Sequence, residues 1–371
     1  MWRFSDLLPV TDAASVTSLG EGDTPLLPSS GPTLGSFRLH FKAEFRGPTG
    51  SFKDRIAAVA AALIRERGLT GAVGTSSGNG GAAMAAYGAR GGFPVVLFTT
   101  SGIVDGKLRQ ILAHGATAYI VERLEGGRAG AGVAPTIATM AERAGWLAFL
   151  TGARYAPVMM IGAETIAFEL AEQHPDLDAV YVPVGGGGLL ASIWRGYRRL
   201  PDVVTPRLIG VQPEGCPTLR LGLSGALDPL TGPVTTTISG LQVPVLFDYG
   251  ALEAVTRSSG WSVEVADAQA WNAQRLLARE EGLFVEPAGA TALAGYLADL
   301  EGGRLTPDDE VAVLLTGAGH KDLAAVDRVA GGNEPLRIGP DEVEDAFARL
   351  VRSPETQQSR RIVDTVRSPS Q

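Results

Sequence analysis

Short apolar runs alternate along this chain with longer segments rich in helix-forming residues, and this alternation constrains the fold more than any other feature. The apolar runs are bounded mostly by turn residues and are predicted strands, at residues 94–99, 117–121, 179–184, 207–211 and 311–316. The longer segments are predicted helices, at residues 56–68, 80–90, 107–114, 134–144, 162–172, 189–199, 267–281 and 289–300. This order predicts an α/β fold with parallel sheets that helices cover on both faces.

Glycine is concentrated at the predicted turns from strand to helix. The chain has 48 glycines in 371 residues, well above the average of about 7%. They gather in segments 78–81 and 185–188, where backbone without side chains can approach a ligand closely. Since ligands of parallel α/β folds bind at the carboxyl ends of strands, we expect a ligand at these turns.

The charge of the chain excludes broad classes of partner. Lys and Arg number 32 against 40 Asp and Glu, a net charge of −8, and the isoelectric point is near 5.2. Nucleic acid and anionic lipid bind mainly through clustered Lys and Arg, so we expect neither. No stretch approaches the roughly 20 apolar residues of a membrane span, and the N-terminus has no apolar run of signal-peptide length. The expected partners are a small molecule and other protein chains.

Cysteine and histidine do not indicate disulfide or metal chemistry. The one cysteine, Cys216, cannot form a disulfide within the chain. This suits the reducing cytoplasm, and we interpret Cys216 as an inert thiol. The four histidines, His40, His114, His174 and His320, are scattered without metal-ligand spacing. We therefore expect a cytoplasmic protein without a metal site.

A lysine follows a turn of small residues and precedes a helix in the segment PTGSFKDR, residues 48–55. The start of a helix carries partial positive charge, which together with burial lowers the pKa of the Lys53 amine. A neutral amine can attack a carbonyl group. Taken alone, the segment favours a surface lysine over a catalytic one, and its significance depends on the motifs around it.

Three further motifs lie where predicted strands end or helices begin. Residues 75–89 (TSSGNGGAAMAAYGA) place hydroxyl, amide and glycine N–H groups at a helix start, which can bind a carboxylate or simply cap the helix. Residues 182–190 (VPVGGGGLL) can curl backbone N–H groups around a phosphate or form a flexible loop. In residues 314–322 (LLTGAGHKD), the Thr316 hydroxyl can meet a heterocyclic nitrogen or cap the strand.

Together and in this order, the four motifs resemble those of the fold-type II enzymes that depend on pyridoxal 5′-phosphate (PLP), the tryptophan synthase β family, and most closely those of its threonine synthase branch. The resemblance covers most of the chain and includes GDTPLL, GKLRQILAHGA, GAETIAFEL, SGL and FVEPAGATALAG. Aspartate after the lysine and the TGAGHKD segment are typical of this branch rather than of serine and threonine dehydratases. The resemblance implies two doubly wound domains with parallel sheets and PLP in the cleft between them.

The resemblance also implies a role for each matching residue. Lys53 would hold PLP as a Schiff base, Phe52 would lie against the cofactor ring, and Asn79 would contact its phenolic oxygen. Thr316 would face the pyridine nitrogen. The cofactor phosphate would be bound by Gly185, Gly186, Gly187 and Gly188. The substrate carboxylate would be bound by Thr75, Ser76, Ser77 and Gly78.

A hydroxyl at Thr316 cannot hold a protonated pyridine as a carboxylate would, so elimination gains over transamination. The freed amine of Lys53 can remove the α-proton, after which a leaving group on the β carbon departs. A leaving group on the γ carbon needs a second deprotonation, and Lys53 is again the base. Hydrolysis then gives a keto acid and ammonia, whereas addition of water or another nucleophile gives a new amino acid.

Two positions depart from the threonine synthase pattern. In that branch an Asn-Pro-Tyr-Arg sequence usually precedes the GxxT helix, and its arginine helps to hold the phosphate of O-phosphohomoserine. If Pro157 matches the family proline, Ala156 replaces the asparagine and Met159 the arginine. Loss of a guanidinium that makes paired hydrogen bonds to phosphate is not a neutral change. Lys107 and Arg154 are then candidate anion ligands, or plain surface charges.

Several functions stay open on this sequence. We favour threonine-synthase-like elimination or replacement at the β or γ carbon of an L-amino acid with an altered substrate, because substrate-side positions differ while the cofactor motifs are intact. One alternative is a genuine threonine synthase whose phosphate site is rebuilt around Lys107 or Arg154. Others are a serine or threonine dehydratase-like ammonia-lyase and a PLP-binding protein without turnover.

The expected domain organisation has three parts. We expect a large PLP-binding domain of residues 1–57 and 148–332 and a small, mobile substrate-binding domain of residues 58–147. A C-terminal helix and flexible tail are expected over residues 333–371, where the sequence becomes charged and then polar. The family resemblance also implies a homodimer.

Overall fold

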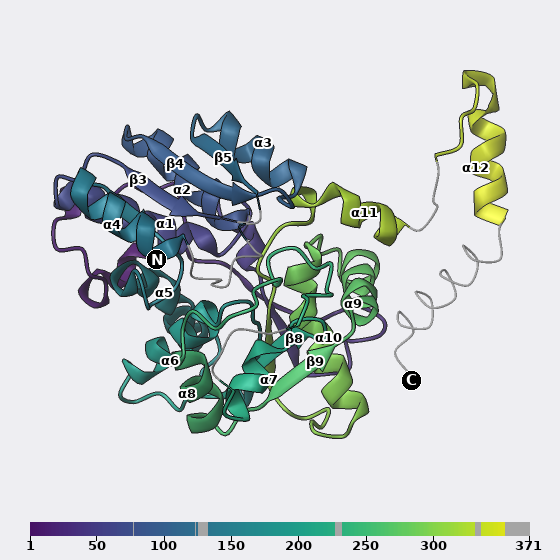
Figure 1. The fold of residues 1–371 in the computed structure, drawn as a ribbon. Coiled ribbons are helices and arrows are strands. Elements are labelled where there is room, and N and C mark those ends of the chain that lie inside the picture. The colour runs from purple at the N-terminus through teal and green to yellow at the C-terminus, as the bar shows by residue number, and fades with distance from the viewer. Residues whose placement is uncertain (77, 123, 125–132, 227–231, 331–334, 353–371) are drawn as a thin grey trace. The chain divides into compact units, whose positions relative to one another are not determined.

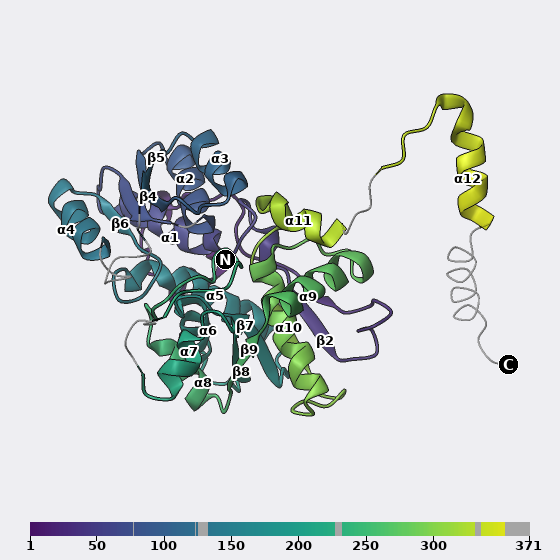
Figure 2. The ribbon, with the colours of Figure 1, turned by 45° about the vertical axis from the view of Figure 1, so that its right-hand side comes forward.

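The computed structural model describes residues 1–76, 78–122, 124, 133–226, 232–330 and 335–352. The chain separates into two compact units, Met1–Val329 and Ala330–Gln371. The first unit holds two sheets and the helices around them (Figures 1 and 2). In the second unit, the described residues form a 3-10 turn (Pro340–Glu342) and helix α12 (Val343–Arg352). Among the helices described, none has the length and apolar character needed to cross a membrane.

The larger sheet has six strands in the order β1-β2-β10-β7-β8-β9. They are β1 (Leu26–Pro28), β2 (Leu39–Lys42), β7 (Ala179–Pro183), β8 (Arg207–Pro213), β9 (Ser262–Val265) and β10 (Val311–Leu314). All neighbouring pairs are parallel except β1 with β2. Every residue of β7 and β10 is buried, as expected for central strands of a parallel sheet covered on both faces.

Helices pack on both faces of this larger sheet. On one face lie α9 (Asp267–Glu280) and α10 (Pro287–Glu301), which are side by side in Figure 2. On the other face lie α5 (Pro157–Gln173), α6 (Gly188–Arg198) and α8 (Gly250–Arg257). Alternate residues of the strands point into these two apolar layers, so the sheet has a core on each side.

The smaller sheet has four parallel strands in the order β5-β4-β3-β6. They are β3 (Ala72–Thr75), β4 (Val95–Thr100), β5 (Thr117–Val121) and β6 (Leu147–Phe149). One face packs against α1 (Lys53–Glu66), α2 (Asn79–Gly91) and α3 (Asp105–Ala113). The other packs against α4 (Ala134–Ala144). The helix α1 also packs against α5, which covers the larger sheet, and thus connects the two sheets.

Short elements complete the fold of the first unit. They are α7 (Thr218–Leu223), α11 (Leu323–Ala330) and the 3-10 turns η1 (Trp2–Leu7), η2 (Ala13–Ser15), η3 (Glu44–Arg46) and η4 (Gly319–Lys321). The five predicted strands and the eight predicted helices are all present. The architecture therefore confirms the α/β class with parallel sheets covered on both faces. The proposed domain boundaries within the first unit stay predictions.

Candidate active site

The carboxyl ends of strands from both sheets border one cavity of about 290 Å³. Thr75 ends β3 and Thr100 ends β4 in the smaller sheet. Pro183 ends β7 in the larger sheet, and Thr316 follows β10. All four residues line the cavity, which therefore lies where parallel α/β sheets bind ligands.

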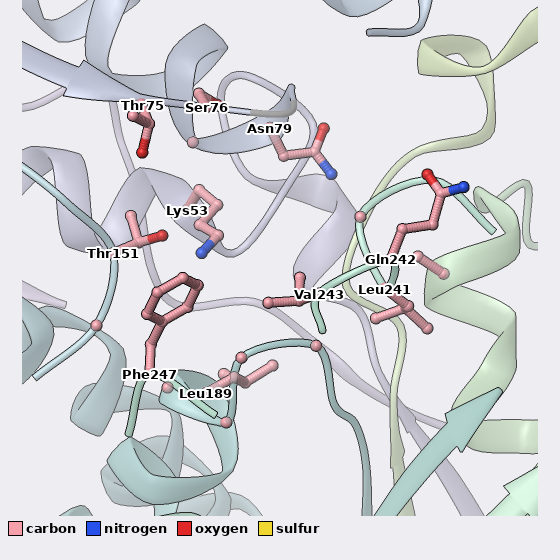
Figure 3. Close-up of a pocket in the computed structure, with 18 of the residues that line it drawn as sticks. Lys53, Thr75, Ser76, Asn79, Thr151, Leu189, Leu241, Gln242, Val243 and Phe247 are labelled. Atoms are coloured by element: carbon pink, nitrogen blue, oxygen red, sulfur yellow. The ribbon is translucent and has the colours of Figure 1, made fainter. Parts of the chain in front are cut away.

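Lys53 is the first residue of α1, and its side chain reaches the middle of the cavity (Figure 3). Two contacts fix the turn before it: the backbone N–H of Phe52 donates to the carbonyl oxygen of Thr316 at 3.2 Å, and Ser51 forms a β-bridge with Gly317. The amine nitrogen lies 4.8 Å from the centre of the Phe52 ring. Burial lowers the pKa of Lys53 to about 8. A sizeable fraction of the amine is therefore neutral and nucleophilic near neutral pH.

A buried group of charges anchors α1 two residues after Lys53. The Arg55 guanidinium lies 2.7 Å from a Glu44 oxygen and 2.6 Å from a Glu169 oxygen. The Lys42 amine lies 2.7 Å from Glu169. These four side chains are at most 1% exposed, so loss of one of them would leave a net buried charge. The network thus holds the start of α1 against α5, η3 and β2.

Four glycines connect β7 to α6 and line the cavity: Gly185, Gly186, Gly187 and Gly188. Gly187 has a φ of +87°, a conformation that glycine adopts far more readily than other residues. A Cβ atom at Gly187 would lie 2.8 Å from the carbonyl oxygen of Asp248, and one at Gly185 would lie 2.9 Å from that of Gly240. This backbone without side chains at the start of α6 is suited to an anion such as a phosphate.

A buried glutamate joins two other lining residues in the cavity wall. One Glu286 oxygen, Oε2, lies 3.0 Å from the Lys107 amine. The other, Oε1, accepts a 2.7 Å hydrogen bond from Nδ2 of Asn79. Lys107 also donates to the Ser239 hydroxyl at 3.3 Å. The Lys107 and Glu286 side chains are only 2% and 3% exposed, so the two charges neutralise each other where solvent screens little.

The loop after β3 places polar groups at the start of α2. Thr75 and Ser76 line the cavity. The Ser76 hydroxyl accepts hydrogen bonds from the backbone N–H groups of Gly78 at 3.1 Å and Gly81 at 2.6 Å, so it shapes the loop. Gly78 does not line the cavity but packs against the aliphatic chain of Lys107, where a Cβ atom would collide.

Most of the predicted site residues meet at this cavity. Those that line it are Phe52, Lys53, Thr75, Ser76, Asn79, Lys107, Gly185, Gly186, Gly187, Gly188 and Thr316. Ser77 lies outside the described residues. Arg154 is exposed and does not line the cavity, and its guanidinium lies 5.6 Å from the ring of Tyr155. Met159, which would take the place of the branch's arginine if Pro157 matches the family proline, is buried in α5.

Some residues near Lys53 had no role in the sequence-based interpretation. Thr151 and Phe247 flank the lysine, and Val243 lies close by (Figure 3). No motif indicated these three, because loops bring them to the cavity only when the chain folds. Glu286 does carry a signal, since it is the single charged residue in the motif FVEPAGATALAG.

Comparison with known proteins agrees with this geometry. Residues 17–317 match a family model described as "Pyridoxal-phosphate dependent enzyme". Threonine synthase of Methanocaldococcus jannaschii is 34% identical over 354 residues, which cover 92% of this chain and 85% of that protein. Threonine synthase of Bacillus sp. (strain ULM1) is 33% identical over 327 residues, which cover 86% of this chain and 89% of that protein.

Solved structures share the fold. A threonine deaminase of T.th. matches with a TM-score of 0.64 and 28% identity, covering 80% of this chain and 92% of that one. The processed form of threonine deaminase isoform 2 from Solanum lycopersicum matches with a TM-score of 0.69 and 23% identity, covering 88% of this chain and 92% of that one. At this lower identity the second match supports the fold alone.

Proposed function

Because the chain belongs to the family of pyridoxal-phosphate dependent enzymes, we propose that it catalyses threonine-synthase-like elimination or replacement at the β or γ carbon of an L-amino acid whose leaving group carries no phosphate. The cofactor and the broad class of enzyme follow from the family and from the threonine synthase relatives. The nature of the leaving group is inferred from the charges of the cavity.

The residues of the cavity fit PLP. Lys53 offers an amine with a lowered pKa. The glycines between β7 and α6 leave room beside bare backbone for its phosphate. The buried Oδ1 of Asn79 has no hydrogen-bond partner among the described residues, so this side chain has capacity left for a polar group of the cofactor. Thr316 lies against the lysine turn, where its hydroxyl would meet the ring nitrogen.

Proton transfer and orientation fall to the protein side chains. Bound PLP supplies the electron sink that acidifies the α-proton of the amino acid. The neutral amine of Lys53 would remove that proton and, for a leaving group on the γ carbon, a proton from the β carbon as well. Thr75 and the N–H groups at the start of α2 would hold the substrate carboxylate and so direct the α carbon toward Lys53.

The charge balance of the cavity carries the proposal about the leaving group. Among its described lining residues, Lys53 and Lys107 are the cations and Glu286 is the anion. Lys53 is committed to the cofactor, and Lys107 is neutralised by Glu286 at 3.0 Å. Arg154 is exposed outside the cavity. The described wall thus offers no uncommitted cation to a phosphate on the substrate, whereas a neutral leaving group such as hydroxyl needs none.

A second candidate is genuine threonine synthase activity, which converts O-phosphohomoserine and water into threonine and phosphate. The identity of 34% to the Methanocaldococcus jannaschii threonine synthase favours it. An ammonia-lyase activity is favoured only by the structural likeness to a threonine deaminase. All three reactions begin with the same deprotonation by Lys53 and differ in the leaving group and in the fate of the product.

A substrate panel distinguishes these activities. The PLP-loaded enzyme is incubated with O-phosphohomoserine, homoserine, serine, threonine and uncharged O-acyl derivatives, and products are identified by mass spectrometry together with phosphate and ammonia release. We expect a phosphate-free substrate to exceed O-phosphohomoserine in kcat/KM by at least about 100-fold, about 2.7 kcal/mol. Preferential turnover of O-phosphohomoserine, with one phosphate released per threonine, would contradict the proposal. Lys53→Ala protein gives the background of uncatalysed reaction.

Other features of the proposed enzyme have their own tests. We propose that it acts as a cytoplasmic homodimer with a large domain of residues 1–57 and 148–332 and a mobile small domain of residues 58–147. Light scattering on the PLP-loaded protein tests the homodimer, which should have twice the mass of one chain. Small-angle scattering with and without substrate measures the movement of the small domain.

A further inference from the structure

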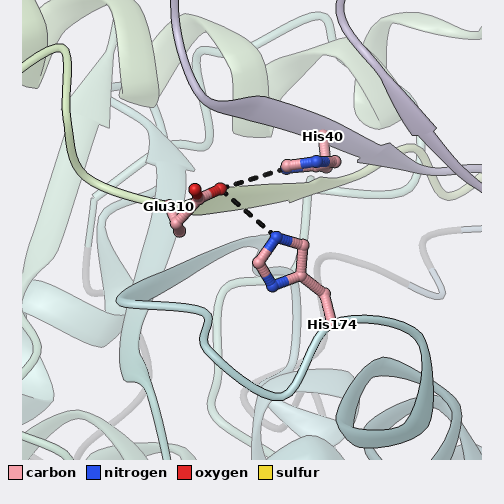
Figure 4. A group of neighbouring side chains, drawn as sticks. All are labelled: His40, His174 and Glu310. Carbon is pink, nitrogen blue, oxygen red and sulfur yellow. Dashed lines mark ion pairs between the residues drawn. The ribbon is translucent and has the colours of Figure 1, made fainter.

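Two histidines and a glutamate from distant parts of the sequence meet near the start of β10 (Figure 4). His40 lies on β2, His174 follows the last residue of α5, and Glu310 directly precedes β10. None of the three lines the candidate active site. The cluster is therefore separate from the residues proposed to act on the amino acid.

Backbone contacts hold the three residues of this cluster in place. His40 pairs with Ala312 in the parallel ladder of β2 and β10. The N–H of Glu310 donates to the carboxylate of Asp178 at 2.8 Å, and the carbonyl of Glu310 accepts from the N–H of Asp178 at 2.8 Å. The N–H of His174 donates to the carbonyl of Leu170 at 2.8 Å, as in the last turn of a helix. The side chains thus start from rigid positions.

The side chains converge on one carboxylate oxygen. Oε2 of Glu310 lies 3.2 Å from Nε2 of His174 and 3.9 Å from Nδ1 of His40. One ligand atom from each of the three residues lies within 4.8 Å of the other two. The remaining oxygen, Oε1, is oriented by Arg38 at 3.3 Å. At 3.9 Å the buried His40 nitrogen is too far away for a hydrogen bond, and it has no other partner among the described residues.

The chemistry of this set suits a transition-metal ion. Two imidazoles and one carboxylate match the ligands of zinc rather than those of magnesium or calcium, which prefer oxygen. Zinc bonds of about 2.0–2.2 Å place ligand atoms roughly 3.4 Å apart, so the three ligand atoms, which lie within 4.8 Å of one another here, would move closer together on binding.

We propose that His40, His174 and Glu310 bind one zinc-class divalent ion, with a fourth position open to solvent. The three side chains are 18%, 22% and 22% exposed, so the cluster lies close to solvent. An ion bound here joins β2, the end of α5 and the start of β10. Since it binds the folded chain and not the unfolded one, it raises stability without contacting the active site.

Metal titration of the untagged, PLP-loaded protein tests this site. After removal of metal with EDTA and dialysis, zinc is titrated calorimetrically, and cobalt is titrated by its visible absorbance, which reports coordination by nitrogen and oxygen. The wild type should bind one ion per chain and unfold at a higher temperature with zinc. His174→Ala and Glu310→Gln should weaken binding by at least about 100-fold and abolish the zinc-dependent rise in Tm. His114→Ala, a histidine at the end of α3 outside the cluster, should behave as wild type.

Two results would overturn the proposal. One is wild-type protein that is folded by circular dichroism but takes up no zinc or cobalt, which would leave the cluster as contacts among three side chains. The other is one ion per chain in the His40→Ala/His174→Ala double variant with unchanged affinity, which would place the ion elsewhere. The Tm of each variant measured in EDTA separates loss of metal binding from loss of folding. The lysine-bound PLP absorbance should stay unchanged throughout, because the cluster does not contact the cavity.

Discussion

The turn before α1 fixes the position of Lys53. The carboxylate of Asp54 accepts hydrogen bonds from the backbone N–H of Thr49 at 2.9 Å and from its hydroxyl at 2.7 Å, which closes the turn beside the lysine. Burial raises the pKa of Asp54 to about 6, yet at neutral pH the group is still charged and able to accept both bonds. Burial also acts on Lys53 itself and lowers its pKa to about 8. The sequence predicted this direction partly from the helix start, whereas in the structure burial is the cause.

The lowered pKa of Lys53 predicts how PLP attaches to the apoprotein. Only the neutral amine attacks the aldehyde, so the rate should rise with pH up to about 8 and then level off. A free lysine, with a pKa of about 10.4, would keep rising by about tenfold per pH unit beyond that point. Stopped-flow absorbance of lysine-bound PLP measures the rate, and Nα-acetyl-lysine in place of protein corrects for titration of PLP itself. A rate still climbing about tenfold per unit above pH 9 would contradict the prediction, and Lys53→Ala should show no attachment.

Glu286 is expected to keep the cavity from attracting phosphate. In Glu286→Gln the amide oxygen can still accept from Asn79, but Lys107 loses its neutralising charge. Inorganic phosphate should then inhibit about tenfold more strongly, a difference of about 1.4 kcal/mol. Steady-state inhibition constants measure the effect. In the double variant Glu286→Gln/Lys107→Met the gain should disappear. An unchanged inhibition constant in the single variant would show that the charge of Lys107 does not reach the ligand.

At the scale of elements, the glycine turn between β7 and α6 shows how a local conformation can create a candidate binding surface. The carbonyl of Gly186 accepts hydrogen bonds from the N–H groups of Phe247 at 2.9 Å and Asp248 at 3.1 Å. The turn is therefore held from outside by the segment that also brings Phe247 to the cavity. Gly187 has a positive φ, which disfavours residues with a side chain. The carbonyl oxygen of Asp248 also lies too close to leave room for one.

Gly187→Ala should weaken PLP binding. Alanine at φ +87° costs about 1–2 kcal/mol, and its Cβ would lie 2.8 Å from a backbone oxygen, so the turn must shift. We expect a loss of PLP affinity of at least about tenfold, or about 1.4 kcal/mol, in titrations of the apoprotein. Gly225 is a matched control, because it has φ +96° and no atom lies within 4 Å of the position that a Cβ would take. Equal losses of affinity in Gly187→Ala and Gly225→Ala would show that backbone strain alone is responsible, and not the collision at the glycine turn.

The elements that the sequence predicted are those with a strong local signal. Strands such as β7 and β10 are continuous apolar runs between turn residues, and helices such as α1 consist of strong helix formers. The strands β1, β2, β3, β6 and β9, each of three or four residues, were not predicted, because none of them was recognised as a continuous apolar run. They become strands by pairing with neighbours, as β3 does between β4 and β6.

The candidate site likewise contains residues that the sequence predicted and contacts that it did not. Lys53, the glycine turn and Thr316 were predicted from motifs that are contiguous in sequence, and the structure brings them together. The pairing of Lys107 with Glu286 could not be predicted, because it joins α3 to the residue before α10. The cluster of His40, His174 and Glu310 has no metal-ligand spacing in the sequence for the same reason, since its members lie on three distant elements.

At the scale of the whole first unit, the buried charges around Arg55 fix the relative positions of elements that are distant in sequence. Apolar packing is less directional and would fix these positions less strictly. The guanidinium contacts Glu44 in η3 and Glu169 in α5, and it also donates to the hydroxyls of Thr24 and Thr165. Although burial alone would lower the pKa of Arg55, the two carboxylates raise it above its usual value. Although burial alone would raise the pKa of Glu169, Arg55 and Lys42 hold it well below its usual value. Arg55 and Glu169 are therefore both charged at neutral pH.

Removing Arg55 should destabilise the protein in a pH-dependent way. Arg55→Met leaves Glu44 and Glu169 buried without the guanidinium, which should lower the free energy of unfolding by about 3–5 kcal/mol at pH 7. In the wild type the folded-state pKa of Glu169 is depressed, so its contribution is present above the unfolded pKa near 4.5 and is lost as the pH falls below it. In the variant only Lys42 still opposes the effect of burial on Glu169, so that pKa should rise, and the deficit is largest at neutral pH and shrinks as the carboxylates protonate.

Urea unfolding followed by circular dichroism at pH 7 and at pH 4.5 measures the deficit caused by Arg55→Met. Arg109→Met is the matched control, because Arg109 pairs with Asp105 at the surface, with side chains 77% and 72% exposed, and its removal should produce no measurable change. An equal deficit at both pH values would mean that lost packing, rather than unpaired charge, destabilises the variant. Since Arg55 follows Lys53 by two residues on α1, the variant should also lose PLP at lower urea concentrations than those that unfold the rest of the chain.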